Sequence, residues 1–141
     1  DRAIVLPLDV RDDFILPDAV RNAEAMLGRP IDMVFHCQAG ITSWSGSDFD
    51  VNHVRRHLQV MDSILWGAVG LTKAVLPSML DRQEGHIIVL AGGSSPLLTS
   101  EGRSAETASR SAVQGYFDSL RAEVARDRIK ITVVHRPGLT K

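Results

Sequence analysis

Two pairs of neighbouring side chains have the residue types of a metal site or a nucleophilic centre. His53 and His57 have the i, i+4 spacing of a helical metal pair, but two arginines stand between them and no third ligand is evident. A solvated helix face explains this pair better. His36 and Cys37 place a base beside a nucleophile, yet adjacent residues of a strand point to opposite faces, so we interpret them as buried packing. The sequence predicts no metal site.

Serines and glycines gather in a loop that follows an apolar run. Gly92-Gly93-Ser94-Ser95 lacks the Gly-x-Ser-x-Gly turn of a hydrolase, and it does not lead directly into a helix as a phosphate-binding turn does. Cradling of a phosphate is therefore the weaker interpretation. We expect a loop whose Ser94 and Ser95 hydroxyls are able to hydrogen-bond a substrate oxygen.

Alternating apolar runs and helical stretches must position these side chains. Short, nearly continuous apolar runs are typical of strands buried on both faces, and they cover Ala3 to Leu8, Ile31 to Cys37, Gly85 to Leu90 and Ile129 to His135. Apolar residues at three- and four-residue steps predict helices from Pro17 to Gly28, Val51 to Leu80 and Ala105 to Arg126. Gly67 and Gly70 interrupt the second helix, so we expect a kink or a break there.

This alternation predicts an α/β fold, a doubly wound parallel sheet with helices on both faces. The length of 141 residues allows one domain. The formal net charge of −1 does not indicate a basic surface for nucleic acid. The single cysteine excludes a disulfide framework and favours a reducing compartment. The longest apolar stretch, Ile64 to Leu80, carries Lys73 and is too short to span a bilayer, so no membrane segment is predicted.

Four motifs occur in an order that resembles a known family. They are Leu8-Asp9-Val10, the strand-to-loop segment Asp32 to Gly40, the helical segment Leu71 to Met79, and Arg136-Pro137-Gly138. Together with the segment Arg103 to Val124, they resemble the short-chain dehydrogenase/reductase family, and that last segment is most similar to its endoplasmic-reticulum-associated members. Each motif is weak by itself, but five in register over most of the chain are a strong resemblance.

The resemblance implies a Rossmann-type fold and an NAD(P)-dependent oxidoreductase. Such an enzyme transfers a hydride between the nicotinamide and a small carbonyl or hydroxyl compound. The positions that would line the cofactor are Asp9, Val10, Ala39, Gly40, Pro137 and Gly138. Asp9 has a second interpretation that we weigh equally, as the cap of the turn that follows its strand.

The catalytic positions depart from the family pattern. By alignment, Glu106 occupies the position of the catalytic tyrosine and Arg110 that of the lysine four residues later. The asparagine position falls on Ile64, and the serine position falls on Gly92, or on Ser94 if the loop is shifted. Glu106 and Arg110 are either an altered catalytic pair or, as we favour, an i, i+4 surface ion pair.

The remaining side chains do not restore this chemistry. Tyr116 is the only tyrosine and lies ten residues beyond Glu106, about 15 Å along a helix axis. A glutamate carboxylate is ionised at neutral pH and does not readily donate a proton, and an arginine cannot relay one. We therefore expect the usual catalytic tetrad to be degenerate in this chain.

A second departure concerns the cofactor turn and the extent of the chain. The family begins with a strand, a Gly-rich turn and a helix that hold the pyrophosphate, and nothing here matches them. We therefore interpret residues 1–141 as a partial Rossmann domain that opens in the third strand, lacks the first two, and also lacks the substrate-binding segment that follows Pro-Gly in the family. Ala3 to Leu8 would then have no neighbouring strand, which exposes apolar edges.

Three functional hypotheses stay open on these residues. The chain belongs to an oxidoreductase, to a non-catalytic relative that acts as a binding or scaffolding module, or to a truncated product without activity. We also expect a homo-oligomer through the helix Ala105 to Arg126. The location would be cytoplasmic, or the endoplasmic-reticulum membrane if an upstream segment anchors the intact protein. The substrate and the choice of NAD or NADP are not predicted.

Overall fold

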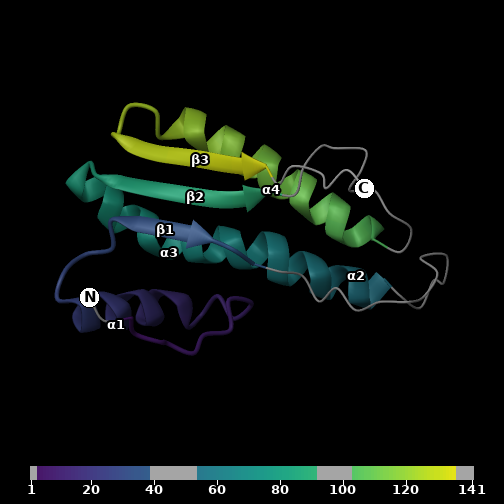
Figure 1. Ribbon diagram of the computed structural model, residues 1–141, viewed down its shortest axis with the longest axis horizontal. Coiled ribbons are helices and arrows are strands. Elements are labelled where there is room, and N and C mark those ends of the chain that lie inside the picture. The colour runs from purple at the N-terminus through teal and green to yellow at the C-terminus, as the bar shows by residue number, and fades with distance from the viewer. Residues whose placement is uncertain (1–2, 39–53, 92–102, 136–141) are drawn as a thin grey trace.

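The computed structural model describes residues 3–38, 54–91 and 103–135, and over these ranges helices and strands alternate. The elements, in chain order, are α1 (Leu16–Leu27), β1 (Met33–His36), α2 (Val54–Met61), η2 (Asp62–Trp66), α3 (Gly67–Arg82), β2 (Gly85–Ala91), α4 (Ser104–Glu123) and β3 (Ile129–His135). η2 is a π-helical turn that joins α2 to α3 in one continuous rod (Figure 1). The predicted α/β alternation is confirmed.

The strands form one parallel sheet in the order β1-β2-β3. Val34 of β1 is the partner of Ile87 of β2, which in turn is the partner of Ile131 of β3. All three strands therefore end at the same edge of the sheet. This is the arrangement that consecutive βαβ units produce.

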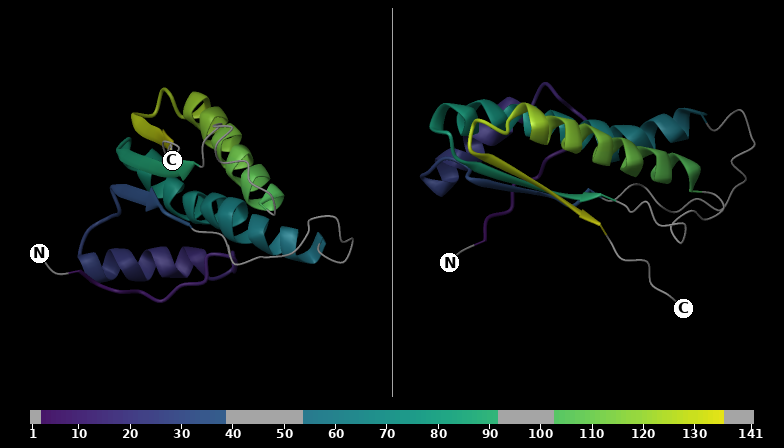
Figure 2. Two further views of the ribbon diagram at one scale, coloured as in Figure 1. Left: turned by 45° about the vertical axis from the view of Figure 1, so that its right-hand side comes forward. Right: turned by 90° about the horizontal axis from the view of Figure 1, so that it is seen from above.

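The described helices all lie on one face of the sheet (Figure 2). Between the sheet and the helices lies the core, which includes Ile87, Val89, Met79 and Phe117, each no more than 1% exposed. On the other face Met33 and Phe35 are each 55% exposed. The sequence predicts helices on both faces of the sheet, whereas within residues 3–38, 54–91 and 103–135 the helices cover one face (Figure 2).

α1 forms where the sequence predicts a helix. Pro17 stands in its first turn, where a missing N–H costs no helical hydrogen bond, and Gly28 ends it with a left-handed φ of 68°. Leu16 and Val20 are its buried residues, and they face α3. The helix therefore docks along the outer side of the rod.

The interruption of the long helix lies one turn earlier than predicted. The irregular turn is η2, and both Gly67 and Gly70 adopt regular helical geometry inside α3. A Cβ atom at Gly67 would lie 2.6 Å from Val10 Cγ2, and one at Gly70 would lie 2.8 Å from Leu16 Cδ1. The two glycines therefore permit close packing of the N-terminal segment instead of breaking the helix.

By length and composition alone, the rod Val54–Arg82 could also cross a membrane. Core helices of globular proteins meet the same criterion, and this rod buries Ile64, Leu65, Ala68, Val69, Val75 and Met79 against the rest of the fold. Burial in the core is thus a sufficient reason for its apolar character.

Two predicted strands differ from the structure. Residues 3–8 form no strand, and Val5 is 86% exposed. An apolar run becomes a strand only when another strand pairs with it, and β1 receives no partner on its free side within the described residues. The predicted strand Ile31 to Cys37 is shortened to Met33–His36 because only these residues pair with β2.

Candidate functional site

The carboxyl ends of the three strands define the candidate site. β1, β2 and β3 end at His36, Ala91 and His135, side by side at one edge of the sheet (Figure 1). Open parallel sheets bind their ligands at this edge. Five of the predicted site residues, Ala39, Gly40, Ser94, Pro137 and Gly138, follow these strand ends in sequence but lie outside the described residues.

Glu106 and Arg110 form an ion pair in the first turns of α4. Arg110 Nε donates to Glu106 Oε1 at 3.0 Å, and Arg103 Nη1 lies 4.0 Å from the other carboxylate oxygen. The predicted i, i+4 pairing is confirmed. The side chains of Glu106 and Arg110 are only 18% and 20% exposed, so the pair is half-buried rather than on the open surface.

This pairing limits what the two residues can do chemically. The Glu106 carboxylate accepts a hydrogen bond from the Arg110 guanidinium and lies beside that of Arg103. An ionised carboxylate accepts protons but has none to donate, and a guanidinium does not release one. The pair can orient a polar group but is a poor source of a proton.

Tyr116 does not join this pair. Its ring packs edge-to-face on Phe117, with centroids 5.2 Å apart, further along α4. Burial, aided by the charge of Glu123, raises the pKa of the Tyr116 phenol above its ordinary value. A catalytic phenol needs the opposite shift, so the structure agrees with the expectation that Tyr116 is no substitute.

Ile64, at the predicted asparagine position, lies inside η2 and is 3% exposed. Its side chain packs in the core and offers no hydrogen-bonding group. Ser109, between Glu106 and Arg110 in sequence, is fully buried, and its hydroxyl donates to the carbonyl oxygen of Ala105 at 2.6 Å. Neither residue supplies a polar group to the site.

His36 and Cys37 point to opposite faces of the sheet, as strand geometry predicts. The prediction that both are buried is wrong for Cys37, which is exposed. His36 is 2% exposed, and its Nε2 lies 2.9 Å from Thr72 Oγ1 of α3. Its Nδ1 lies 3.2 Å from Gln38 Nε2, and burial lowers the pKa of the ring to about 4.

Asp9 caps a turn in the N-terminal segment. Its Oδ1 accepts hydrogen bonds from the Arg11 backbone N–H at 3.0 Å and from Arg11 Nε at 2.9 Å. The side-chain hydrogen bond from Arg11 is the main reason that the pKa of Asp9 is lowered to about 2. The turn-capping interpretation is therefore confirmed, and a contact of Asp9 or Val10 with the cofactor stays a prediction.

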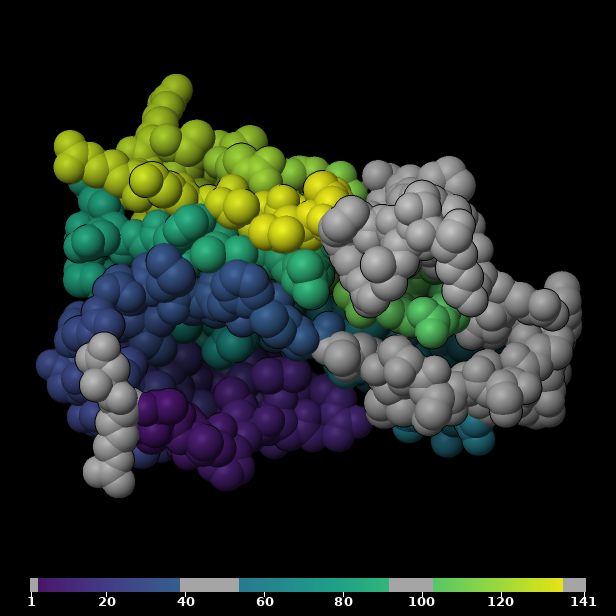
Figure 3. All heavy atoms as spheres, viewed as in Figure 1, coloured from purple at the N-terminus to yellow at the C-terminus, as the bar shows by residue number. Residues whose placement is uncertain are grey.

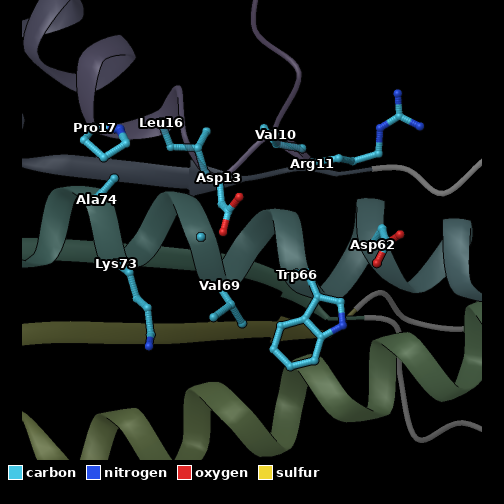
Figure 4. A pocket seen from close by; sticks show the side chains of 11 residues that line it. Val10, Arg11, Asp13, Leu16, Pro17, Asp62, Trp66, Val69, Lys73 and Ala74 are labelled. Carbon is cyan, nitrogen blue, oxygen red and sulfur yellow. The ribbon is translucent and has the colours of Figure 1, made fainter.

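A cavity of about 550 Å³ lies between this segment and the rod (Figure 4). Val10, Leu16 and Pro17 form one wall, and Val69 and Ala74 of α3 lie across from them. Charged side chains of both signs, Arg11, Asp13, Asp62 and Lys73, stand around it. The mixture of charges selects no single class of ligand.

Comparison with known proteins decides the family. The chain matches the short chain dehydrogenase family over residues 1–141. The chain belongs to this family. Dehydrogenase/reductase SDR family member 7B of Xenopus tropicalis is 37% identical over 133 residues, which cover 94% of this chain and 41% of that protein. An SDR family protein 7-like relative from Anopheles gambiae is 36% identical over 96% of this chain and 41% of its own length.

Solved short-chain dehydrogenases have the same fold. A short-chain dehydrogenase from Streptomyces avermitilis has a TM-score of 0.80 and 25% sequence identity over 96% of this chain and 48% of its own. A metagenomic short-chain oxidoreductase in complex with NADP also has a TM-score of 0.80, at 18% identity over 95% of this chain and 59% of its own, and shows the fold alone. The chain spans about two fifths of the length of the curated relatives named above.

The described residues fit one part of a dinucleotide site. The strand ends supply the edge of the sheet at which short-chain dehydrogenases, as Rossmann folds, place their nucleotide, and Gln38 brings a half-buried amide to it. In residues 3–38, 54–91 and 103–135, no Gly-rich turn joins a strand to a following helix. The described residues therefore place the polar side chain of Gln38 at this edge, and they hold no turn of the kind that binds a pyrophosphate.

The His36–Thr72 contact was missed by sequence reasoning. The two residues are 36 positions apart, and periodicity describes which face of one element is apolar, not which residues of two elements meet. The sequence did contain a signal for this contact, because Thr72 falls on the buried face of a helix and His36 on the buried face of a strand. Such polar residues on apolar faces indicate a buried hydrogen bond.

Proposed function

We propose that the protein is an NAD(P)-dependent oxidoreductase of the short-chain dehydrogenase family that acts on a small carbonyl or hydroxyl compound. The observation that carries this proposal is the parallel sheet, whose strand ends lead directly into the segments that resemble the family's cofactor motifs. In this proposal the cofactor is lined by Asp9, Val10, Ala39, Gly40, Pro137 and Gly138. Ser94 orients the oxygen of the substrate.

Such a reaction needs a proton donor, and the usual donor residues of the family are replaced in this chain. A bound dinucleotide supplies the hydride, and reduction of a carbonyl then requires one proton at the substrate oxygen. Glu106 and Arg110 stand at the positions of the usual donor pair, and Glu106 already accepts a hydrogen bond from Arg110. We therefore propose that turnover is slow, because the proton comes from solvent and not from this pair.

A second candidate function is that of a non-catalytic binding module of the same family. The observation that favours it is the combination of the Glu106–Arg110 pair with Ile64 buried in η2, because three positions of the tetrad then lack their usual chemistry. In this case the protein binds the dinucleotide but catalyses no hydride transfer.

The two candidates are separated by measuring binding and turnover on the full-length protein. Fluorescence titration with NADH and NADPH measures binding, and oxidation of either cofactor in the presence of a panel of ketones and aldehydes measures turnover. Slow turnover supports the oxidoreductase, whereas binding without turnover supports the binding module. Failure to bind either cofactor contradicts both.

The role of the ion pair is tested by two matched variants on α4. Glu106→Gln removes the charge at the catalytic position, and Asp118→Asn removes the charge of the Asp118–Arg121 pair, which has a 2.8 Å contact further along the helix. If Glu106 takes part in catalysis, only the first variant changes turnover. Equal effects of the two variants mean that Glu106 has a structural role.

We also propose that α4 contributes to a homo-oligomer. Ala108, Ser111 and Gly115 are small and exposed on its outer side, and a Cβ atom at Gly115 would meet nothing within 4 Å. Gly115→Arg should therefore reduce the mass measured by sedimentation of the full-length protein.

For localisation we propose the cytoplasm, or the endoplasmic-reticulum membrane if a segment outside residues 1–141 anchors the protein. Fractionation of cells tests this proposal.

A further inference from the structure

Three hydrogen-bonded side chains lead from the core to the carboxyl edge of the sheet. Thr72 of α3 is fully buried, and its Oγ1 lies 2.9 Å from Nε2 of His36, the last residue of β1. Nδ1 of His36 lies 3.2 Å from Nε2 of the half-buried Gln38. The function proposed above makes no use of these contacts.

The chemistry of the groups sets the direction of both hydrogen bonds. An amide nitrogen only donates, so Gln38 Nε2 donates and His36 Nδ1 accepts. Burial lowers the pKa of His36 to about 4, so at pH 7 the ring is neutral and carries its single proton on Nε2. That proton is donated to the hydroxyl oxygen of Thr72.

The consequence for Gln38 is a fixed amide plane. The nitrogen and the carbonyl oxygen of an amide share one plane, so a hydrogen bond that holds the nitrogen also fixes the oxygen. A glutamine without this contact has several rotamers, and a ligand that binds it must offset the loss of that freedom. The contact with His36 removes this cost before any ligand arrives.

We propose that Thr72 and His36 are positioning residues that present the carbonyl oxygen of Gln38 as a hydrogen-bond acceptor for a ribose hydroxyl group of the dinucleotide. This inference rests on the proposed function, which places the dinucleotide at the carboxyl edge of the sheet. Gln38 directly precedes Ala39 and Gly40, two of the predicted cofactor residues. A ribose hydroxyl is a donor that matches the acceptor at Gln38.

The test uses the full-length protein with Thr72→Val, which removes the hydroxyl at nearly constant volume, and Gln38→Ala, which removes the acceptor. A matched control exists in the same sheet, because His86 Nε2 lies 2.9 Å from Thr132 Oγ1 in an exposed pair. Thr132→Val removes that bond without touching Gln38. Dissociation constants for NADH and NADPH at pH 7.5 are measured by fluorescence titration.

We expect Thr72→Val and Gln38→Ala to raise the dissociation constant about five- to tenfold, the effect of one lost hydrogen bond. Thr132→Val should bind the cofactors as tightly as the unchanged protein. Thr72→Ser keeps the hydroxyl and should therefore also bind them as tightly as the unchanged protein. NMR correlation of the imidazole nitrogens gives a readout independent of the cofactor, with the Nε2–H tautomer in the unchanged protein and a tautomer mixture in Thr72→Val.

Two results separate the failure of this inference from that of the proposed function. If the unchanged protein binds dinucleotide and both folded variants bind it equally well, the positioning role is wrong and the function stands. A His36 ring protonated on Nδ1 also overturns it. If the unchanged protein binds neither NADH nor NADPH, the proposed function fails and this inference fails with it.

Discussion

At the scale of single residues, the least expected feature is a neutral histidine in the core. A buried imidazole without a carboxylate partner is stabilised only by hydrogen bonds, here those with Thr72 and Gln38. The only cause of the lowered pKa is burial, which disfavours the charged ring. Protonation of His36 therefore lowers the stability of the fold.

This predicts a specific dependence of stability on pH. The pKa of His36 is about 4 in the folded chain and about 6.5 in the unfolded chain, so between these values the unfolded chain binds more protons. The free energy of unfolding should fall as the pH is lowered from about 6.5 to 4, by about 3 kcal/mol, and level off below. Urea unfolding between pH 7 and pH 4 measures this.

The control for this prediction is a pair of histidine variants. His36→Leu should flatten the pH dependence in this window, while His86→Asn, at a half-buried histidine outside the core, should leave it in place. An unchanged slope in His36→Leu would show that other groups are responsible.

Restoring the usual catalytic pair should restore little activity. Glu106→Tyr with Arg110→Lys supplies a phenol and an ammonium group at the aligned positions, but Ile64 stays apolar and buried and Gly92 carries no hydroxyl. We expect less than about a tenfold gain in kcat/KM, because groups that act as a unit are strongly non-additive. A gain of a hundredfold in steady-state assays of the full-length protein would contradict this.

At the scale of elements, the sequence predicted those features that depend on residues within a single helix or strand. Helical periodicity with Pro17 and Gly28 predicted α1 to within one residue at each end, and Ile129–His135 is the strand as predicted. The run at residues 3–8 is also apolar, but whether it forms a strand depends on a neighbouring strand that composition does not reveal. Likewise Glu106 and Arg110 were predictable because they share one helix, whereas His36 and Thr72 meet across two elements.

The glycines of α3 and α4 predict opposite effects of the same substitution. Gly67→Ala places a Cβ atom 2.6 Å from Val10 Cγ2, and the resulting overpacking of about 1–3 kcal/mol outweighs the gain of about 1 kcal/mol in helix propensity. Gly115→Ala meets no atom and should stabilise the chain by about 0.5–1 kcal/mol. Thermal unfolding of both variants checks the signs, and stabilisation by Gly67→Ala would show that the N-terminal segment does not pack there.

At the scale of the whole molecule, the sheet has one covered and one open face. Figure 3 shows the open face as a surface made by β1, β2 and β3 together, seen without the described helices in front of it. Met33 and Phe35 are exposed on it, and Val134 of β3 is 37% exposed. Parallel sheets are normally covered on both faces, so this surface favours association in the 141-residue chain.

Polar substitution on this face should reduce that association. Met33→Thr with Phe35→Thr removes two half-exposed apolar side chains and keeps residues that favour strands. We expect a lower weight-average mass by light scattering at high concentration. Leu58→Thr, at a position of similar exposure on α2, should have a smaller effect. A monomeric unchanged chain under the same conditions would contradict the role of this face.

The order of the strands has a consequence for how the molecule is made. Because β1, β2 and β3 lie in the sheet in the order in which they occur in the chain, β2 and β3 each have a neighbouring strand already synthesised when they leave the ribosome. The parallel unit of β1, the helical rod and β2 can therefore close before β3 has been synthesised. We expect this sheet to assemble vectorially, with β2 added to β1 and β3 added last.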